Sequence, residues 1–195
     1  MHINWQLREL NLKIVFYGPA LSGKTTTLEK IHDRVPKKRR SEMVSLKTKE
    51  DRTLYFDFLQ LELGKISGLT PKIQLYTVPG QTYYEASRRL VLRGSDGVVF
   101  VADSAPHRLA ANIEAWKNMK THLASFPQPL TDIPVVVQLN KRDLGNALPE
   151  DFLRRKLQVD GYPVFSTVAI SDQGVFDVLK AITGEVVKNL QKIAA

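Results

Sequence analysis

The chain of 195 residues contains no cysteine. We therefore expect no disulfide and no prenyl or palmitoyl anchor. His2 stands where an N-myristoylated chain carries glycine, so we do not expect that anchor either. No apolar run approaches the ~18 residues of a membrane span, and the first residues lack the basic and apolar regions of a secretory signal. These absences predict a cytoplasmic protein, whose recruitment to a membrane or a cell pole would run through its basic surface or a partner.

The chain is basic, with a formal net charge of +8. Such a balance suits contact with nucleic acid or an anionic membrane, and it also suits an anionic nucleotide ligand. The densest basic run, residues 37–40, has no interleaved aromatic residue for base stacking. We interpret it as a solvated loop or a contact patch, and we expect no nucleic-acid partner.

The hydrophobic pattern alternates between strand-like and helix-like segments. The expected strands are Leu12–Tyr17, Leu54–Leu63, Lys72–Val78, Gly97–Ala102, Pro134–Leu139 and Val164–Val168. The expected helices are Thr25–Val35, Ala86–Arg93, Leu109–Ala124, Pro149–Leu157 and Val175–Ile193. The second and third strands should form a hairpin, and residues 36–52 should form a long functional or mobile loop. The pattern predicts one α/β domain over residues 1–195, with a mostly parallel central sheet, one antiparallel edge strand and helices on both faces.

A phosphate-binding loop is predicted between the first strand and the first helix, where the sequence matches G-x-x-x-x-G-K-[ST]. Glycines allow several backbone N–H groups to point into one concavity, and the helix N-terminus adds partial positive charge. The lysine can reach the β- and γ-phosphates, and the following threonine hydroxyl can ligate Mg²⁺. The expected nucleotide-binding residues here are Gly18, Ala20, Leu21, Ser22, Gly23, Lys24, Thr25 and Thr26.

The segment that follows the strand Pro134–Leu139 favours guanine as the base. The carboxylate of Asp143 can accept hydrogen bonds from guanine N1–H and the 2-amino group, whereas adenine would leave it unpaired. Asn140 can tie this segment to the phosphate loop, and the aliphatic stem of Lys141 can cover the ring. Together with the phosphate loop, this motif predicts binding of GTP and GDP.

The chain resembles the Ras-like small GTPases over essentially its whole length, and within them the bacterial MglA-type branch, which governs cell polarity and gliding motility. The segments that carry the resemblance are Asp51–Phe58, Tyr76–Gln81, Val101–Ala105 and Asn140–Leu144. The resemblance implies a Ras-like fold and a molecular switch that hydrolyses GTP slowly. It also implies a chain that is monomeric alone, a Roadblock-type (MglB-like) homodimer as GTPase-activating partner, and downstream effectors that bind the switch regions.

By the same resemblance, Thr25 and Thr53 would hold Mg²⁺, with Thr53 reporting the γ-phosphate from the first switch loop. Arg52 would act as an arginine finger supplied in cis. A solvated switch residue is the alternative interpretation of Arg52.

The second switch would begin at Gly80, whose N–H would bind the γ-phosphate, and Gln81 would orient the attacking water. Gln81 could instead serve only the chemistry of its turn. Val168, Ala169 and Ile170 occupy the place of the loop whose backbone N–H reads guanine O6.

Two residues depart from the usual Ras-like pattern. Thr77 replaces an aspartate that normally supports Mg²⁺ through water, which implies a weaker hold on the metal. Ala20 replaces a glycine, and its methyl group can crowd the catalytic glutamine or arginine. The alternatives are therefore a GTP-bound scaffold with negligible hydrolysis and, since the phosphate loop alone does not define the reaction, a P-loop nucleotide kinase.

Overall fold

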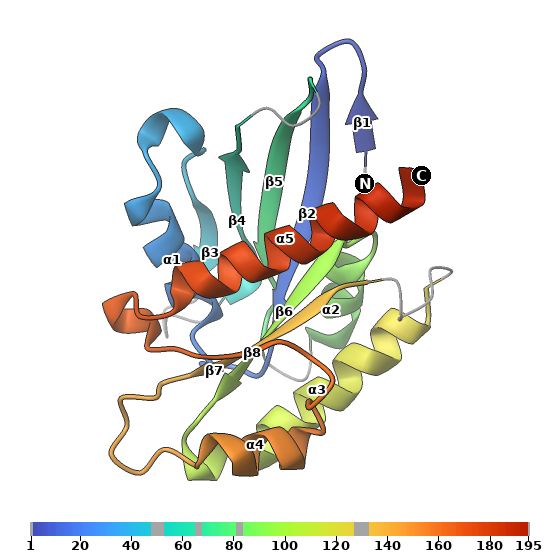
Figure 1. Ribbon diagram of the computed structural model, residues 1–195. Coiled ribbons are helices and arrows are strands. Elements are labelled where there is room, and N and C mark those ends of the chain that lie inside the picture. Colours follow the sequence, from blue (N-terminus) through green and yellow to red (C-terminus); the bar gives the residue numbers. More distant parts are fainter. Residues whose placement is uncertain (1, 48–52, 65–67, 81–83, 127–132, 195) are drawn as a thin grey trace.

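The computed structural model describes residues 2–47, 53–64, 68–80, 84–126 and 133–194 (Figure 1). Its strands form one eight-stranded sheet in the order β3-β4-β5-β2-β6-β7-β8, with β1 paired to β2. The strands are β1 (His2–Asn4), β2 (Glu9–Tyr17), β3 (Val44–Lys47), β4 (Thr53–Glu62), β5 (Thr70–Thr77), β6 (Gly97–Asp103), β7 (Val135–Asn140) and β8 (Val164–Ser166). The strands β5, β2, β6, β7 and β8 are parallel, whereas β4 runs antiparallel to β5.

Helices cover both faces of the sheet in the described part of the chain. They are α1 (Lys24–Arg34), α2 (Glu85–Leu92), α3 (Leu109–Ala124), α4 (Glu150–Leu157) and α5 (Val175–Ala194). One buried cluster joins α1 and α5 to one face of the sheet, and a second joins α2, α3 and α4 to the other. Figure 1 shows α5 lying across one face of the strands. The predicted α/β fold, with a mostly parallel sheet between two helical layers, is confirmed.

The edge of the sheet beyond β4 differs from the expectation. Residues 36–52 were expected to be irregular, but Lys37–Arg39 form a 3₁₀ helix and Val44–Lys47 form β3. Val44 pairs with Phe58 and Ser45 with Asp57, so β3 lies antiparallel on the outer side of β4. Val44–Lys47 alternate apolar and polar residues, a signal at the minimum length for a strand, and the unpaired backbone groups at the edge of β4 provide its partner.

No described helix combines the length and the apolar character that a membrane crossing requires.

Candidate functional site

The residues expected to bind a ligand gather where the parallel strands end. β2 ends at Tyr17 just before the phosphate loop, β6 ends at Asp103, and β7 ends at Asn140. β6 lies between β2 and β7 in the sheet, so these three ends are neighbours. This is the edge at which open α/β sheets bind their ligands.

The phosphate loop is held in a tight conformation between β2 and α1. Gly23 has a φ of 99°, in the left-handed region that favours glycine, and a Cβ there would lie 2.1 Å from Asn140 Nδ2. The ammonium of Lys24 donates hydrogen bonds to the carbonyls of Gly18 (3.0 Å) and Pro19 (2.7 Å). Burial lowers the pKa of Lys24 to about 7, and the Asp57 carboxylate opposes this shift. An anion bound in the loop would therefore stabilise the charged form of a lysine that desolvation penalises.

Asn140 connects three parts of the site through its buried side-chain amide. Nδ2 donates to the carbonyl of Ser22 in the phosphate loop (2.8 Å). Oδ1 accepts from the N–H of Ala169 (2.9 Å) and from the hydroxyl of Thr167 (3.1 Å), both beyond β8. The tie between this segment and the phosphate loop, expected from the sequence, is present.

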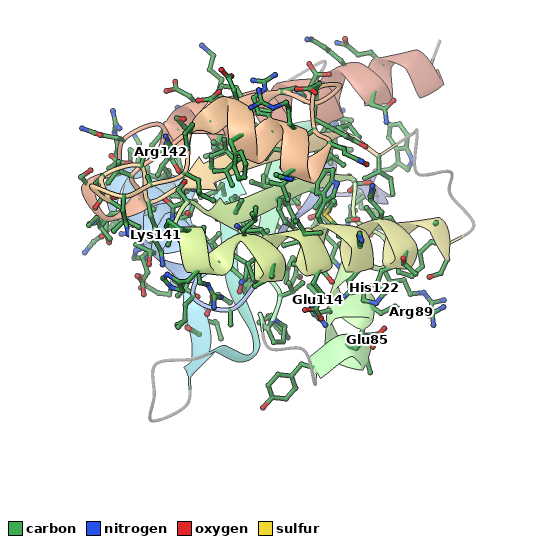
Figure 2. The ribbon with its side chains drawn as sticks, turned by 90° about the horizontal axis from the view of Figure 1, so that it is seen from below. Glu85, Arg89, Glu114, His122, Lys141 and Arg142 are labelled. Atoms are coloured by element: carbon green, nitrogen blue, oxygen red, sulfur yellow. The ribbon has the colours of Figure 1, made fainter. Side chains whose placement is uncertain are left out.

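The segment after β7 leaves Asp143 exposed. Lys141 adopts a left-handed φ of 64°, and its ammonium donates to Asp103 Oδ2 at 2.7 Å. The N–H of Arg142 donates to the carbonyl of Thr167 (3.1 Å), which anchors the segment to the loop after β8. Figure 2 shows Lys141 and Arg142 together at one end of the molecule. The carboxylate of Asp143 is therefore presented from an anchored segment and remains accessible to a base.

A buried carboxylate that the sequence motifs do not predict lies beside the phosphate loop. Asp57, on β4, is fully buried. Its carboxylate accepts hydrogen bonds from the hydroxyls of Thr25 (2.5 Å), Thr77 (2.7 Å) and Ser45. The sequence contains an indication of this role. Asp57 shares its face of the strand with the buried Leu59 and Leu61, and a carboxylate is rarely buried unless other groups bind it.

A phosphate loop tied by Asn140 to a segment with an exposed carboxylate, Asp143, is the arrangement expected of a GTP-binding domain, and comparison with known proteins agrees. The model of the ADP-ribosylation factor family matches residues 2–186. The chain belongs to this family of small GTPases.

Two relatives illustrate the range of similarity. Over 190 residues, which cover 97% of each chain, the sequence is 48% identical to the Mutual gliding-motility protein MglA of Myxococcus xanthus (strain DK1622). Over 148 residues it is 30% identical to ADP-ribosylation factor-like protein 4D of Bos taurus, with 76% of this chain and 66% of that protein covered. The predicted MglA-type resemblance and the assignment as a guanine nucleotide-binding GTPase are confirmed.

In this ADP-ribosylation factor family member, Gly80 packs directly on the phosphate loop. A Cβ at Gly80 would lie 2.3 Å from the Cα and 2.4 Å from the backbone nitrogen of Ala20. The carbonyl of Ala20 also accepts a hydrogen bond from the guanidinium of Arg108 (2.5 Å). Gly80 is thus next to the loop, as its expected role at the γ-phosphate requires, and only a residue without a side chain fits there.

The two residues expected to catalyse hydrolysis, Arg52 and Gln81, lie outside the described residues. Thr53 is the first residue of β4. Val168 and Ala169 are buried, whereas Ile170 is exposed. The N–H of Ala169 donates to Asn140, so in this structure it makes a hydrogen bond within the protein. The functional roles assigned to these residues remain predictions.

A polar cluster joins α2, which follows the expected second switch, to α3. The Nε2 atom of His122 on α3 lies 3.3 Å from the carboxylate of Glu85 on α2, and its Nδ1 lies 3.4 Å from the hydroxyl of Tyr17. Figure 2 shows Glu85 and His122 close together between the two helices. Burial raises the pKa of Tyr17 to about 12, so its hydroxyl remains protonated at neutral pH.

Replacing Asn140 with alanine should loosen the site. Asn140→Ala leaves the Ser22 carbonyl, the Ala169 N–H and the Thr167 hydroxyl without this partner, at about 1–3 kcal/mol for each buried group left unsatisfied. We expect a lower unfolding temperature and at least ~10-fold weaker binding of GDP, measured by thermal unfolding and fluorescence titration. Asn146→Ala, at an exposed position of the same segment, is the matched control. Equal behaviour of the two variants would contradict the connecting role of Asn140.

Proposed function

We propose that this chain is a cytoplasmic molecular switch of the MglA type, which binds GTP with Mg²⁺ and hydrolyses it slowly until a partner accelerates the reaction. The similarity to the Mutual gliding-motility protein MglA supports a role in cell polarity or gliding motility. The observation that carries the proposal is the Asn140 amide, because its bond to the Ser22 carbonyl joins the phosphate loop to the segment that bears Asp143.

Guanine would be selected by Asp143. Its exposed carboxylate can accept from N1–H and the 2-amino group of guanine. Adenine presents an acceptor at N1 and no 2-amino group, so ATP would lose both bonds. The same argument disfavours the nucleotide-kinase alternative.

The residues near the phosphate loop fit Mg²⁺. This cation prefers oxygen ligands and keeps several waters in nucleotide sites. The hydroxyl of Thr25 lies at the start of α1, beside the buried carboxylate of Asp57. Thr25 and Thr53 would hold the ion, which when bound neutralises charge on the β- and γ-phosphates.

Hydrolysis would depend on Gln81 to orient the attacking water and on Arg52 to neutralise transition-state charge. Lys24 would bind the β- and γ-phosphates, and the N–H of Gly80 would bind the γ-phosphate. Ala20 supports slow unaided turnover, because Gly80 packs on its backbone and its methyl group adds bulk to the loop next to the segment that continues to Gln81. A GTP-bound scaffold with negligible hydrolysis is the second candidate that this crowding favours.

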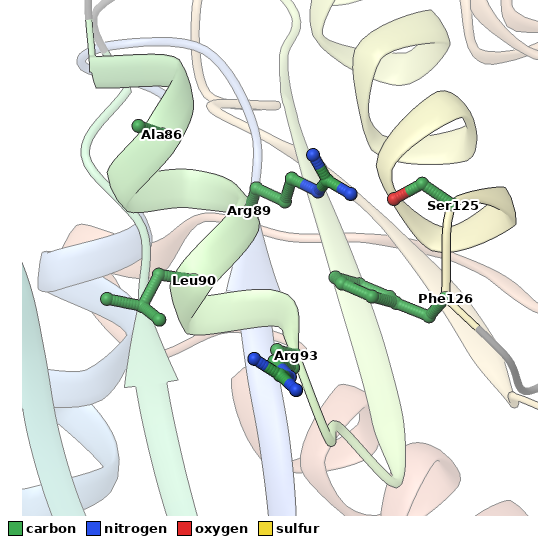
Figure 3. A pocket seen from close by; sticks show the side chains of 6 residues that line it. All are labelled: Ala86, Arg89, Leu90, Arg93, Ser125 and Phe126. Atoms are coloured by element: carbon green, nitrogen blue, oxygen red, sulfur yellow. The ribbon is translucent and has the colours of Figure 1, made fainter.

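Partners would dock on the surface next to the second switch, which includes α2. A cavity of about 490 Å³ lies between α2 and the end of α3 (Figure 3). It is lined by Ala86, Arg89, Leu90, Arg93, Ser125 and Phe126. Leu90 is 70% exposed, and neither Arg89 nor Arg93 pairs with a carboxylate among the described residues. These two positive charges suit an acidic partner surface, such as that of a Roadblock-type homodimer or an effector.

The base assignment predicts a change of nucleotide preference. In Asp143→Asn, the side-chain amide can accept from N1–H and donate to the 2-oxo group of xanthine, but it cannot accept both guanine donors. We expect GTP to bind about 10- to 100-fold more weakly, and xanthosine triphosphate to bind more tightly than in the wild type. Competition titration with both nucleotides measures this, and an unchanged preference for guanine would refute the role of Asp143.

The catalytic assignments predict slower hydrolysis without loss of binding. Gln81→Leu and Arg52→Ala should each lower the single-turnover rate of GTP hydrolysis by roughly 100-fold or more in the presence of the activating partner. Affinity for a non-hydrolysable GTP analogue should stay within about twofold of the wild type. A wild-type rate in either variant would remove that residue from catalysis, and a wild type that never hydrolyses GTP with the partner would favour the scaffold.

Substitutions on the α2 surface should lower partner-stimulated hydrolysis without affecting unaided hydrolysis. Arg89→Glu and Arg93→Glu should each reduce partner-stimulated hydrolysis at least ~10-fold, because they place negative charge against an acidic partner. The unaided rate should not change. Lys180→Glu, an exposed charge reversal on α5 at the other face of the sheet, should leave both rates at their wild-type values. Stimulation that persists in both arginine variants would place the partner elsewhere.

A further inference from the structure

Two large apolar side chains lie in solvent in the turn between β1 and β2. Trp5 is 74% exposed and Leu7 is 63% exposed. The turn is nevertheless ordered, because Asn4 pairs with Glu9 in the sheet and its side-chain oxygen accepts a hydrogen bond from the Leu7 N–H (3.1 Å). Large apolar side chains that are exposed together, and not singly, mark a contact surface. The turn therefore holds Trp5 and Leu7 in place for contact with something outside the chain.

A run of basic residues follows α1. Lys37, Lys38 and Arg39 form the 3₁₀ helix, and all three side chains are exposed. Arg8 is also exposed, in the turn between β1 and β2. Within the described part of the chain, none of these four side chains forms an ion pair with a carboxylate. Their charges are therefore available to an anion outside the chain.

The sheet brings the turn and the 3₁₀ helix to the same end of the molecule. The N–H of Thr70, at the start of β5, donates to the carbonyl of Arg8 (2.8 Å). Since β4 is antiparallel to β5, the start of β5 lies beside the end of β4, where Leu61 forms a bridge with Arg40, the residue after the 3₁₀ helix. Figure 1 shows the turn at the top of the molecule, whereas the phosphate loop follows the lower end of β2. Residues 5–8 and 37–39 thus form a distal surface, which faces away from the nucleotide site.

The chemistry of the distal surface matches that of a membrane interface. Tryptophan is favoured between lipid headgroups and hydrocarbon because its ring is apolar and its indole N–H is polar. Basic side chains are attracted to anionic headgroups, and their aliphatic stems can cover apolar surface. Nearby carboxylates oppose this attraction only in part, because Glu9 pairs with Lys72 (2.5 Å) and Glu42 lies 3.9 Å from His32 Nε2, whereas Glu62 is exposed. The distal surface therefore keeps an excess of positive charge.

The shape of this end favours a membrane over a protein partner. In Figure 1 the turn between β1 and β2 projects beyond the neighbouring ends of β4 and β5. Two cavities in the described part of the chain lie elsewhere, between α2 and α3 and between β8 and α5. A projecting apolar turn needs a matching pocket on a protein partner, whereas a fluid bilayer admits it without one.

We infer that the distal surface binds the anionic face of a lipid bilayer. Trp5 and Leu7 enter the headgroup region, and Arg8 and Lys37–Arg39 contact the lipid phosphates. The nucleotide site lies at the other end of the sheet, so it stays accessible to partners while the chain is bound to the membrane. This inference goes beyond the proposed switch and does not depend on the bound nucleotide.

Tryptophan fluorescence tests the entry of Trp5 into the bilayer. The chain has two tryptophans, and Trp116 is buried, so a change in emission on adding vesicles reports Trp5. With vesicles of phosphatidylcholine and phosphatidylglycerol, the emission of the full chain should shift to shorter wavelength and be quenched by lipids brominated near the headgroup. Vesicles of phosphatidylcholine alone should cause neither change, because they lack the anionic charge that attracts the basic residues.

Charge reversal tests the role of the 3₁₀ helix. Lys37→Glu/Lys38→Glu should weaken co-sedimentation with the anionic vesicles at least ~25-fold, because each lysine near an anionic surface contributes about fivefold in affinity. Arg155→Glu/Lys156→Glu, at consecutive exposed positions of α4, is the matched control, since it changes the net charge equally. Its affinity should stay within about threefold of the wild type, because salt screens charges more than ~10 Å from the membrane.

Removal of one apolar side chain tests the turn. Leu7→Ser retains Trp5 as the reporter and should bind the vesicles at least ~5-fold more weakly, as expected when part of a leucine side chain no longer leaves water. Leu90→Ser, at a 70% exposed leucine on α2, is the control and should bind as the wild type does. Neither leucine is buried, so both variants should fold.

Three results would overturn the inference. The first is a Trp5 emission that does not change when the chain co-sediments with the vesicles, or a Leu7→Ser variant that binds as tightly as Leu90→Ser, since either means attraction without entry. The second is an equal loss of binding in the two double variants, which would mean that only the net charge matters. The third is a wild type that does not bind anionic vesicles, which would leave an acidic protein as the occupant of the distal surface.

Discussion

The side-chain amide of Asn140 is the interaction on which the site depends. A single buried group holds the carbonyl of Ser22 on one side and the Ala169 N–H and Thr167 hydroxyl on the other. The phosphate loop, the segment after β7 and the loop after β8 are thereby fixed to one another. A nucleotide needs its two ends bound at a set separation, and bonds of this kind within the protein fix such a separation before the ligand binds.

Two groups of oppositely charged side chains lie around the parts that Asn140 connects. The segment after β7 is held by the pair of Lys141 with Asp103, whose carboxylate is also 3.7 Å from Arg108. Arg108 in turn donates to the phosphate loop at Ala20. Near the start of α1, Lys24 and Asp57 form a second group of opposite charges. The carboxylates of both groups are buried, so the addition of an anionic nucleotide changes their balance strongly.

The fold was largely predictable because its helices and inner strands follow simple rules. The expected helix Leu109–Ala124 coincides with α3 at both ends, and Pro36 lies just beyond the end of α1. β3 was missed because its alternation of apolar and polar residues covers only four positions, and its partner, the edge of β4, is known only from the three-dimensional structure. At the site, the tie from Asn140 to the phosphate loop followed from the motif, whereas its bonds to Thr167 and Ala169 did not. Asp57 did not, because the motif concerns β5 and only the three-dimensional pairing of β4 with β5 brings this carboxylate to Thr77.

The contact between Gly80 and Ala20 has a consequence for how this site can vary. A side chain at position 80 would overlap the backbone of residue 20, and every amino acid has that backbone. Position 80 is therefore restricted to glycine whichever residue occupies position 20. Position 20 is not restricted in return by the same overlap, because the conflict does not involve its side chain. This contact therefore allows substitution at position 20 but not at position 80. The presence of alanine at position 20 and glycine at position 80 agrees with this.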